Sequence, residues 1–402
     1  MSESARPSKP AHPAGRSPED WQQWFSQQGE PRFRAGQVFR WIHQRGVFDP
    51  AEMTDLGKSL RERLANDGLE SPFVVERVVR STDGTRKLLL RLRDGLAVEC
   101  VLIPMTNDDD ADVAAADADD GDEGEENGGE PTWSGEAPRR VTLCISTQVG
   151  CAMGCVFCAS GKAGLSRGLE SAEIVAQVLI AKRYLDDNER LRNLVFMGMG
   201  EPLHHYEQTL RALRLITHPD GIGMSPRRIT VSTVGLVPNI EKLGRDFDGK
   251  IGLAVSLHAP DDETRNRIMP MNRRYDVAQI LSVLRKYPLP PRRRITIEYT
   301  LIAGVNDSPD HARKLVRALG GLRVKVNLIP MNPVAGSGLG TSSNAAVEQF
   351  HEILSRARIS CSVRKRRGDD VDAACGQLAL NAGVTAPVSD DGAKGRKLPT
   401  MN

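Results

Sequence analysis

The pattern of apolar and polar positions divides the chain into a helical start, a short run of strands and a long region in which strands and helices alternate. Trp21, Trp24 and Phe25 recur at helical spacing, and two further short helical patterns follow. We predict a small helical domain over residues 18–70, after a disordered tail at 1–17 that is rich in proline, serine and charge. Rings at helical spacing usually form a core, but the interleaved arginines also allow contact with RNA.

Three runs between residues 71 and 105 alternate apolar and polar side chains and are separated by two Asp-Gly pairs. This pattern predicts a three-stranded β-meander with tight hairpin turns. Period-two alternation places Glu99 on the opposite face from its neighbours Val98 and Cys100. A single carboxylate on a strand is commonly solvated, so spacing alone gives Glu99 no role.

From residue 139 to 380, short β-branched runs that are apolar on both faces alternate with helical stretches. Such runs predict a parallel sheet covered by helices. Six or seven strand units favour an α/β fold of the partial (β/α) barrel type, ending in a loop that contains a cysteine. An open doubly wound sheet is the alternative, because the pattern does not give the order of the strands. The clearest helical stretches cover residues 171–184, 278–286, 308–319 and 344–356.

Charge is distributed unevenly along the 402 residues. Segment 108–130 holds twelve acidic side chains and no Lys or Arg, which leaves 54 basic against 40 acidic residues, a net of +14, in the rest of the chain. The composition of 106–138 predicts a disordered acidic insertion, and we expect a flexible tail at 381–402. A body this basic could attract a polyanion such as RNA, or its arginines could simply keep the surface soluble.

No apolar run reaches the length of a membrane span, and the first twenty residues lack the apolar centre of a signal peptide. We therefore expect a cytoplasmic protein with no membrane partner. Seven cysteines, an odd number in a reducing compartment, are then expected to act as ligands or reactive thiols rather than as a disulfide framework.

Three of these cysteines, Cys151, Cys155 and Cys158, follow one another at C-x3-C-x2-C spacing. Electron-carrying Fe–S clusters and structural zinc sites usually take four protein ligands. Three thiolates can instead hold a cluster and leave one iron open for chemistry. The alternatives are a zinc site completed by a distant histidine and chance clustering. The spacing resembles the signature of the radical S-adenosylmethionine (SAM) superfamily, in which the open iron chelates SAM.

Polar and glycine residues follow several of the predicted parallel strands. The active site of such folds lies at the carboxyl ends of the strands, so these residues are expected to face one ligand. The Gly200 carbonyl and the Glu201 side chain could accept hydrogen bonds from an ammonium group. His258 could equally be a packed histidine. The candidates are Gly200, Glu201, Ser232, Ser256, Leu257, His258 and Asn332.

Two further cysteines have unusual surroundings. Alternation places Cys144 on one face with small polar residues, which indicates that it faces the cavity. Cys375 lies in a predicted loop, with a basic run before it and three aspartates nearby. These charges shift a thiol pKa in opposite directions, so the ionisation of Cys375 stays open.

At this point the chain resembles a specific family. Its motifs match those of the RlmN family, dual-specificity radical SAM methyltransferases that act on adenine C2 of 23S rRNA and tRNA. The resemblance implies ligation of a 4Fe–4S cluster by Cys151, Cys155 and Cys158, and SAM contacts at the seven strand-end candidates. The matching segments are VECVLIP, LCISTQVGCAMGCVFC, MGMGEPL, ITVSTVGLVP, SLHAP, LIPMNP and RKRRGDDVDAACGQL.

The resemblance also implies a mechanism. Cys375 matches the family's S-methylcysteine, Cys144 its partner thiol and Glu99 its proposed proton acceptor. Two SAM molecules are used per turnover: one methylates Cys375, and the second is cleaved to make that methyl group a radical that adds to electron-poor C2. Cys144, or Glu99, would take the C2 proton, and a Cys144–Cys375 disulfide would form and need reduction.

The implied partners are 23S rRNA, tRNA and an electron donor such as flavodoxin or ferredoxin, and we expect a monomer. The acidic insertion departs from the compact family pattern and follows the strand of Glu99, which leaves the placement of Glu99 open. The nearest rival is the sister family that methylates adenine C8, although Pro202 favours C2. Two more distant rivals are a radical SAM enzyme that acts on another protein and a metal-stabilised RNA-binding module.

Overall fold

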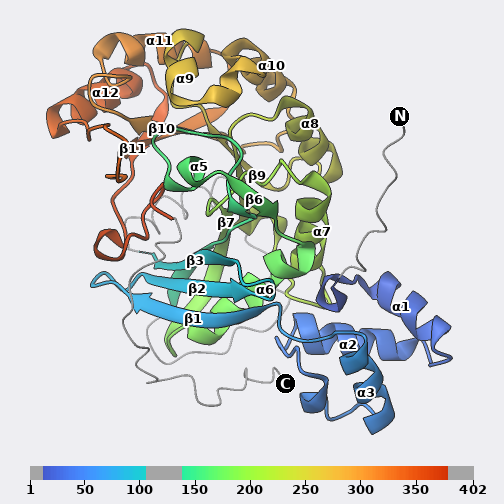
Figure 1. Cartoon of the computed structure of the whole chain (residues 1–402). Helices are drawn as coiled ribbons and strands as arrows, with labels where there is room; N and C mark the ends of the chain where they lie inside the picture. Colours follow the sequence, from blue (N-terminus) through green and yellow to red (C-terminus); the bar gives the residue numbers. More distant parts are fainter. Residues whose placement is uncertain (1–11, 106–137, 379–402) are drawn as a thin grey trace, which may run out of the picture.

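The computed structural model describes residues 12–105 and 138–378 (Figure 1). The chain begins with three short helices that pack around Trp21 and Phe25, both fully buried. Ser17 and Asp20 form a capping box that fixes the start of the first helix. Phe33 is 63% exposed, so this aromatic ring belongs to the surface and not to the core. The helices are α1 (Pro18–Gln27), α2 (Phe33–His43) and α3 (Lys58–Asn66).

One boundary of the predicted disordered tail is wrong. Residues 12–17 are ordered, and Pro13–Gly15 form a 3-10 turn whose Ala14 is buried. The small side chains let this turn pack close to the start of α6 at Ser171 and Ala172. Residues 1–11, the acidic insertion at 106–137 and the tail from 379 lie outside the described residues.

Within the described residues the main sheet has ten strands, and neighbours in space are neighbours in the chain once the small two-stranded sheet of β5 and β6 is set aside. Seven of them, from β4 to β12, pair in parallel and in sequence order, as in a barrel that stays open on one side. A doubly wound sheet reverses its strand order, so that alternative is wrong. The parallel strands are β4 (Arg139–Cys144), β7 (Glu189–Phe196), β8 (Ile229–Thr233), β9 (Gly252–Ser256), β10 (Ile295–Leu301), β11 (Val324–Pro330) and β12 (Ser360–Val363).

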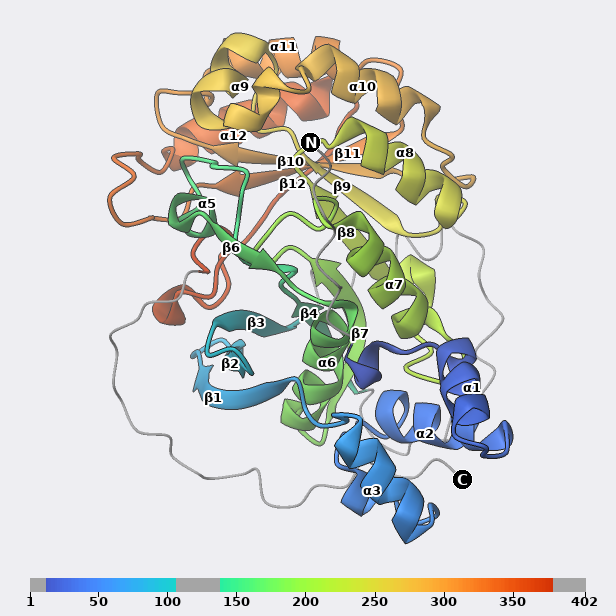
Figure 2. The ribbon, with the colours of Figure 1, turned by 45° about the vertical axis from the view of Figure 1, so that its right-hand side comes forward.

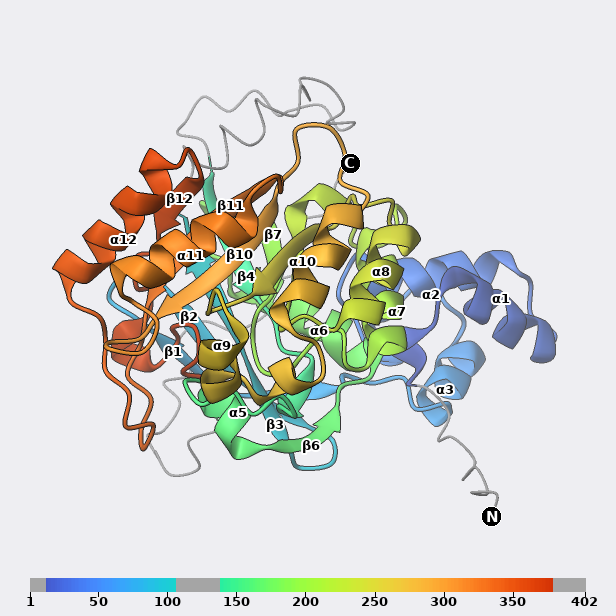
Figure 3. The same ribbon diagram turned by 90° about the horizontal axis from the view of Figure 1, so that it is seen from above.

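Helices lie around the outside of these strands (Figure 3). Serine or aspartate caps begin several of them, including Ser308 before α11 and Ser343 before α12. Among the described residues no helix has both the length and the apolar character needed to cross a membrane. The helices are α5 (Ala159–Ala163), α6 (Ser171–Ala181), α7 (Tyr206–Thr217), α8 (Val237–Asp246), α9 (Asp262–Ile268), α10 (Val277–Lys286), α11 (Pro309–Leu319) and α12 (Asn344–Arg356).

The β-meander continues the barrel sheet (Figure 2). Its strands β1 (Phe73–Arg80), β2 (Arg86–Leu92) and β3 (Ala97–Pro104) are antiparallel, and β3 pairs with β4 in the register Val101 to Cys144. Glu99 is two residues from Val101 and therefore shares the sheet face of Cys144. The strand that carries Glu99, β3, therefore pairs directly with the first barrel strand, β4, although the acidic insertion separates the two strands in the sequence.

Candidate active site

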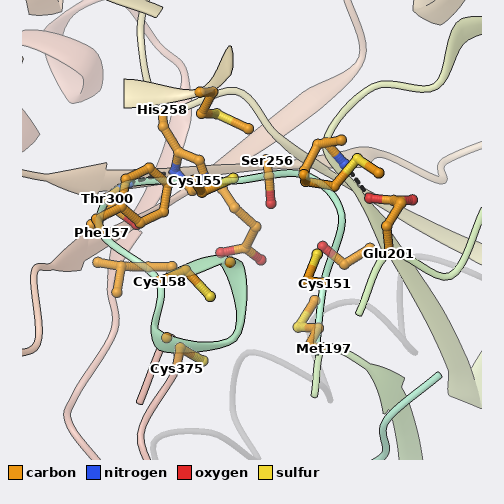
Figure 4. Close-up of a pocket in the computed structure, with 18 of the residues that line it drawn as sticks. Cys151, Cys155, Phe157, Cys158, Met197, Glu201, Ser256, His258, Thr300 and Cys375 are labelled. Atoms are coloured by element: carbon orange, nitrogen blue, oxygen red, sulfur yellow. Dashed lines mark hydrogen bonds between the residues drawn. The ribbon is translucent and has the colours of Figure 1, made fainter. Parts of the chain in front are cut away.

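A pocket at the carboxyl ends of the barrel strands brings most of the predicted site residues together (Figure 4). Leu257, Cys144 and Glu99 lie outside its lining. The Leu257 side chain is wholly buried, and Glu99 and Cys144 share one face of the adjacent strands β3 and β4. The predicted residues that line the pocket are Cys151, Cys155, Cys158, Gly200, Glu201, Ser232, Ser256, His258, Asn332 and Cys375.

The three-cysteine loop starts directly after β5 (Gln148–Gly150), and the chain returns through α5 to β6 (Leu165–Gly168), which pairs with β5. The Cys151 N–H donates a 2.8 Å hydrogen bond to the Gly164 carbonyl. Cys158 is the N-cap residue of α5, and the backbone N–H groups of Ser160 and Gly161 partly offset the effect of burial on the pKa of its thiol. Burial raises the pKa of each thiol, that of Cys151 to about 12. The thiols are thus neutral without metal and would lose their protons when iron binds.

The donor set fits a cluster held by three cysteines. Cys151, Cys155 and Cys158 line one pocket, and after burial it is their mutual charge that most raises the pKa of Cys155. No three described His, Cys, Asp or Glu side chains are arranged to hold a single metal ion. A cubane presents its irons at separate corners, so its thiolate ligands stand farther apart than the ligands of one ion.

Arg265 places a fixed positive charge beside this loop. It is fully buried, and its charge acts on the Cys155 thiol, favouring the thiolate. Its guanidinium donates to the backbone carbonyls of Val234 at 2.6 Å, Leu257 at 3.0 Å and Ser256 at 3.2 Å. One side chain therefore ties the ends of β8 and β9 together, as the planar fork of arginine allows.

The turn after β7 carries Gly200 and Glu201. Gly200 has φ of +104°, and a Cβ there would stand 2.6 Å from the Gln148 side chain, so only glycine fits. The Glu201 carboxylate accepts hydrogen bonds from the N–H groups of Leu203 at 3.1 Å and Val234 at 2.8 Å. Burial raises its pKa to about 7. A carboxylate has further lone pairs, so this one can still accept from an ammonium group.

His258 is both buried and part of the pocket. It adopts a left-handed backbone conformation with φ of +56°, which is uncommon outside glycine and often marks a functional position. Its Nδ1 accepts a 2.9 Å hydrogen bond from the Thr300 N–H, so the proton of the neutral ring lies on Nε2. Burial lowers its pKa to about 3, and the ring meets Phe157 edge to face. His258 is therefore a neutral donor.

The loop of Cys375 is fastened to the three-cysteine loop. The Asn332 side chain donates a 2.9 Å hydrogen bond to the Cys375 carbonyl, and the Ala159 N–H donates to the Gly376 carbonyl at 2.8 Å. The Ser160 hydroxyl donates to the Leu378 carbonyl. These bonds hold the Cys375 thiol in the pocket next to Cys158, whose pKa is raised by burial and also by the charge of Cys375.

Cys144 and Glu99 lie beside this loop on the sheet. Burial, and after it the charge of Cys375, raises the pKa of Cys144 to about 12. Glu99 is buried and forms an ion pair with Lys87 at 3.3 Å. The same Lys87 ammonium donates to the carbonyl of Asp372, three residues before Cys375, at 3.2 Å. Lys87 thus connects the Glu99 strand to the cysteine loop. All seven cysteines are free thiols.

Sequence reasoning missed several pocket residues. Phe157, Thr300 and Arg364 line the pocket. Phe157 had a signal, because it lies between Cys155 and Cys158. Glu298 had a signal: it is a charged residue within ITIEYTL, a strand in which every residue is buried. Buried carboxylates are rare unless they are paired or functional.

Comparison with known proteins identifies the family. A profile of the radical SAM superfamily matches residues 145–316, and one of the ribosomal RNA large subunit methyltransferase N-terminal domain matches 15–68. A dual-specificity RNA methyltransferase RlmN from Sorangium cellulosum is 58% identical over 93% of this chain and 96% of its own length. The Geobacter sulfurreducens RlmN is 45% identical, over 90% and 91%. The chain belongs to the RlmN family.

A solved structure supports the same conclusion. A radical SAM methyltransferase from Sphaerobacter thermophilus superposes with a TM-score of 0.80 at 40% identity, covering 92% of this chain and 99% of that one. Membership of the RlmN family confirms the predicted fold class and a SAM-dependent radical methyltransferase. It also confirms SAM and a 4Fe–4S cluster as the cofactors, as the radical SAM superfamily implies.

Proposed function

We propose that this chain methylates carbon 2 of adenine in 23S rRNA and in tRNA through a methyl group carried on Cys375. The observation that carries the proposal is the position of Cys375, which lines the same pocket as Cys151, Cys155 and Cys158 and is close enough to affect the pKa of Cys144. A carrier thiol needs SAM on one side and a resolving thiol on the other. The relatives are named dual-specificity RNA methyltransferases, and the matched N-terminal domain is that of a ribosomal RNA large subunit methyltransferase, which supports RNA as the substrate.

Cys375 acts first as a nucleophile. Its sulfur attacks the methyl carbon of one SAM. A bond forms between the Cys375 sulfur and that carbon, the bond from the carbon to the SAM sulfur breaks, S-adenosylhomocysteine leaves and the thiol proton is lost. Cys151, Cys155 and Cys158 would hold the cluster, which when bound supplies the electron that cleaves a second SAM. Glu201 and the Gly200 carbonyl hold the SAM ammonium. The Cys375 methyl group gives one hydrogen atom to the 5′-deoxyadenosyl part of the second SAM. The resulting methylene radical bonds to C2 and joins protein to RNA.

Cys144 then releases the product. The adduct loses its C2 proton to Cys144 or Glu99 and returns its unpaired electron to the electron carrier. The Cys144 sulfur, once deprotonated, attacks the Cys375 sulfur. The bond between the Cys375 sulfur and the transferred carbon then breaks with its electron pair on that carbon, which takes a proton to become the methyl group. The resulting disulfide takes two electrons to return to thiols. We propose a donor of the flavodoxin or ferredoxin type for the electrons that cleave SAM, a monomeric enzyme and a cytoplasmic location.

Nucleoside mass spectrometry tests the proposal. Anaerobically reconstituted protein is incubated with SAM, reductant and unmodified 23S rRNA or tRNA, and the RNA is digested to nucleosides. We expect 2-methyladenosine from both RNAs. 8-Methyladenosine would assign the chain to C8 chemistry, and methyl transfer to neither RNA would overturn the proposal.

A further inference from the structure

A row of polar side chains crosses the inner wall of the barrel. Ser256 on β9, Glu298 on β10, Asn327 on β11 and Ser362 on β12 are aligned in register, one strand to the next. Residues paired in this way lie on the same face of a sheet. The Ser362 hydroxyl donates to the side-chain oxygen Oδ1 of Asn327 at 3.0 Å, and the side-chain Nδ2 of Asn327 donates to Glu298 Oε1 at 3.0 Å.

This chain of hydrogen bonds fixes the Glu298 carboxylate and occupies only one of its oxygens. The other oxygen, Oε2, is buried and has no hydrogen-bond partner in the described structure. The residue is 4% exposed and lines the pocket. A buried acceptor without a donor costs about 1–3 kcal/mol, so native proteins rarely keep one unless a ligand or water satisfies it.

The backbone of Glu298 is joined to the predicted SAM contacts. Its carbonyl accepts hydrogen bonds from the Leu257 N–H at 3.1 Å and the His258 N–H at 3.3 Å. Its side chain is the neighbour of Ser256, about 4.8 Å away across the sheet by ordinary strand spacing. A serine hydroxyl and a free carboxylate oxygen therefore stand side by side in the pocket.

We propose that Glu298 binds the ribose of SAM, its Oε2 accepting a hydrogen bond from a ribose hydroxyl. A vicinal diol offers two adjacent donors, which matches the two oxygen groups of Glu298 and Ser256. This inference rests on the proposed function, in which Glu201 and the Gly200 carbonyl accept hydrogen bonds from the ammonium of SAM. The diol is then the group of SAM that still needs an acceptor.

Two other roles for the carboxylate are open to the same experiment. Glu298 could balance the positive charge of the SAM sulfonium, or it could bind an amino group of the target adenine. Burial raises its pKa, whereas Arg364, the Asn327 amide and Lys325 lower it, so positive charge is already present next to it. A neutral diol brings no further positive charge to the Glu298 carboxylate. We therefore propose the ribose diol as its partner.

Anaerobic equilibrium dialysis of the cluster-loaded protein tests the proposal. It measures the binding constants for SAM, for its 2′-deoxy and 3′-deoxy analogues and for S-adenosylhomocysteine. In Glu298→Gln the amide oxygen can keep the Asn327 bond while an NH2 group replaces Oε2. We expect SAM and S-adenosylhomocysteine to bind about tenfold more weakly, by the same factor, since a hydrogen bond to a charged group contributes that much. Glu352→Gln, an exposed carboxylate on α12, is the matched control and should leave both unchanged.

The analogues separate the possible roles. Wild type should bind at least one deoxy analogue about tenfold more weakly than SAM, and Glu298→Gln should lose that discrimination. Equal binding of SAM and both analogues by wild type overturns the proposal even if the variant fails to fold. Weakening of SAM but not of S-adenosylhomocysteine would make Glu298 a counter-ion, and weakening of RNA binding alone would place it on the adenine; either result overturns it.

Failure of the proposed function would look different. Wild type that binds SAM but methylates neither RNA overturns the RNA activity and leaves the ribose constants interpretable. Wild type that methylates RNA but shows no ribose discrimination overturns only the inference about Glu298.

Discussion

Asn332 donates a hydrogen bond of 2.9 Å to the backbone carbonyl of Cys375. The same asparagine follows β11 and lines the pocket, and its own Oδ1 is buried without a protein partner among the described residues. In the proposed function its oxygen would face SAM, while its nitrogen holds the loop of Cys375. We therefore expect occupancy of the pocket and the position of the Cys375 thiol to be coupled through this amide.

Replacing Asn332 therefore affects two steps. Asn332→Ala removes one hydrogen bond to the loop, about 1 kcal/mol, and an acceptor in the pocket. We expect weaker SAM binding and roughly fivefold slower methylation of Cys375. The intact mass of the protein with time after SAM addition measures the second effect. Asn239→Ala, which removes an amide bond to the Leu203 carbonyl outside the pocket, is the control. Equal rates in wild type and Asn332→Ala would contradict the coupling.

Lys87 joins Glu99 to the cysteine loop, and removing one partner of a buried ion pair is costly because the charge of the other partner loses part of its compensation. Lys87→Met leaves Glu99 without this ammonium and frees the Asp372 carbonyl. We expect a loss of about 3 kcal/mol in the free energy of unfolding and slower product release. Urea unfolding measures the first, with Arg91→Met, whose partner Glu76 lies on the exposed surface, as the control. A loss no larger than in that control would mean that the pair is solvated.

His43 predicts how stability depends on pH. Burial lowers its pKa to about 3, and neither ring nitrogen has a hydrogen bond among the described residues. In the unfolded chain the ring takes a proton near its ordinary pKa of 6.5, so below that pH the unfolded state binds more protons and stability falls. The difference amounts to roughly 2 kcal/mol between pH 7 and pH 5. His43→Leu should lack this part of the loss in urea melts, and parallel curves for the two proteins would contradict it.

The barrel could be predicted from sequence because its signals are local. Apolar runs and helix caps define the elements, and the spacing of Cys151, Cys155 and Cys158 defines the cluster loop. The pattern also gave Glu99 and Cys144 their faces of the strand, but it did not bring them together. To see that Glu99 and Cys144 share one face requires the antiparallel register between β3 and β4, two strands that the insertion separates in the sequence.

The remaining parts of the site depend on contacts between distant segments. Glu298 lies beside Ser256 only because β9 and β10 pair in one particular register. Lys87 reaches the Cys375 loop over 285 residues of sequence. Residues 12–17 were expected to be disordered because their composition is polar and proline-rich, yet small side chains let them pack on α6. Composition indicates how much apolar surface a segment could bury by itself, but not which surface of another segment it can pack against.

Phe33 offers a direct test of RNA contact by the helical part of the chain. Its ring is exposed, and the Arg34 guanidinium lies 5.0 Å from the ring centre. An exposed ring beside a cation can stack on a base, which contributes about 1–3 kcal/mol. We expect Phe33→Ala to weaken tRNA binding by about fivefold or more in filter-binding assays. Val74→Ala, an equally exposed apolar residue on β1, should bind as wild type does. If both variants bind tRNA equally well, the Phe33 ring does not contact the RNA.

Variants that lack Cys144 or Cys375 should lose activity in different ways. Without Cys375 there is no methyl carrier, so Cys375→Ala should bind SAM and RNA but never become joined to RNA. Without Cys144 the methyl group can still be loaded and added to C2, but the adduct has no thiol to resolve it. Cys144→Ala should therefore accumulate a protein–RNA crosslink through Cys375, visible with labelled RNA on a denaturing gel.

Cys361→Ala is the matched control for both thiols, because Cys361 lies on β12 and outside the pocket lining. It should methylate RNA at the wild-type rate and give no crosslink. A double variant that lacks Cys144 and Cys375 should give none either, since the crosslink needs the carrier. Normal turnover by Cys144→Ala, or methylated adenine from Cys375→Ala, would contradict the carrier mechanism while leaving the cluster assignment intact, because neither thiol belongs to the C-x3-C-x2-C loop.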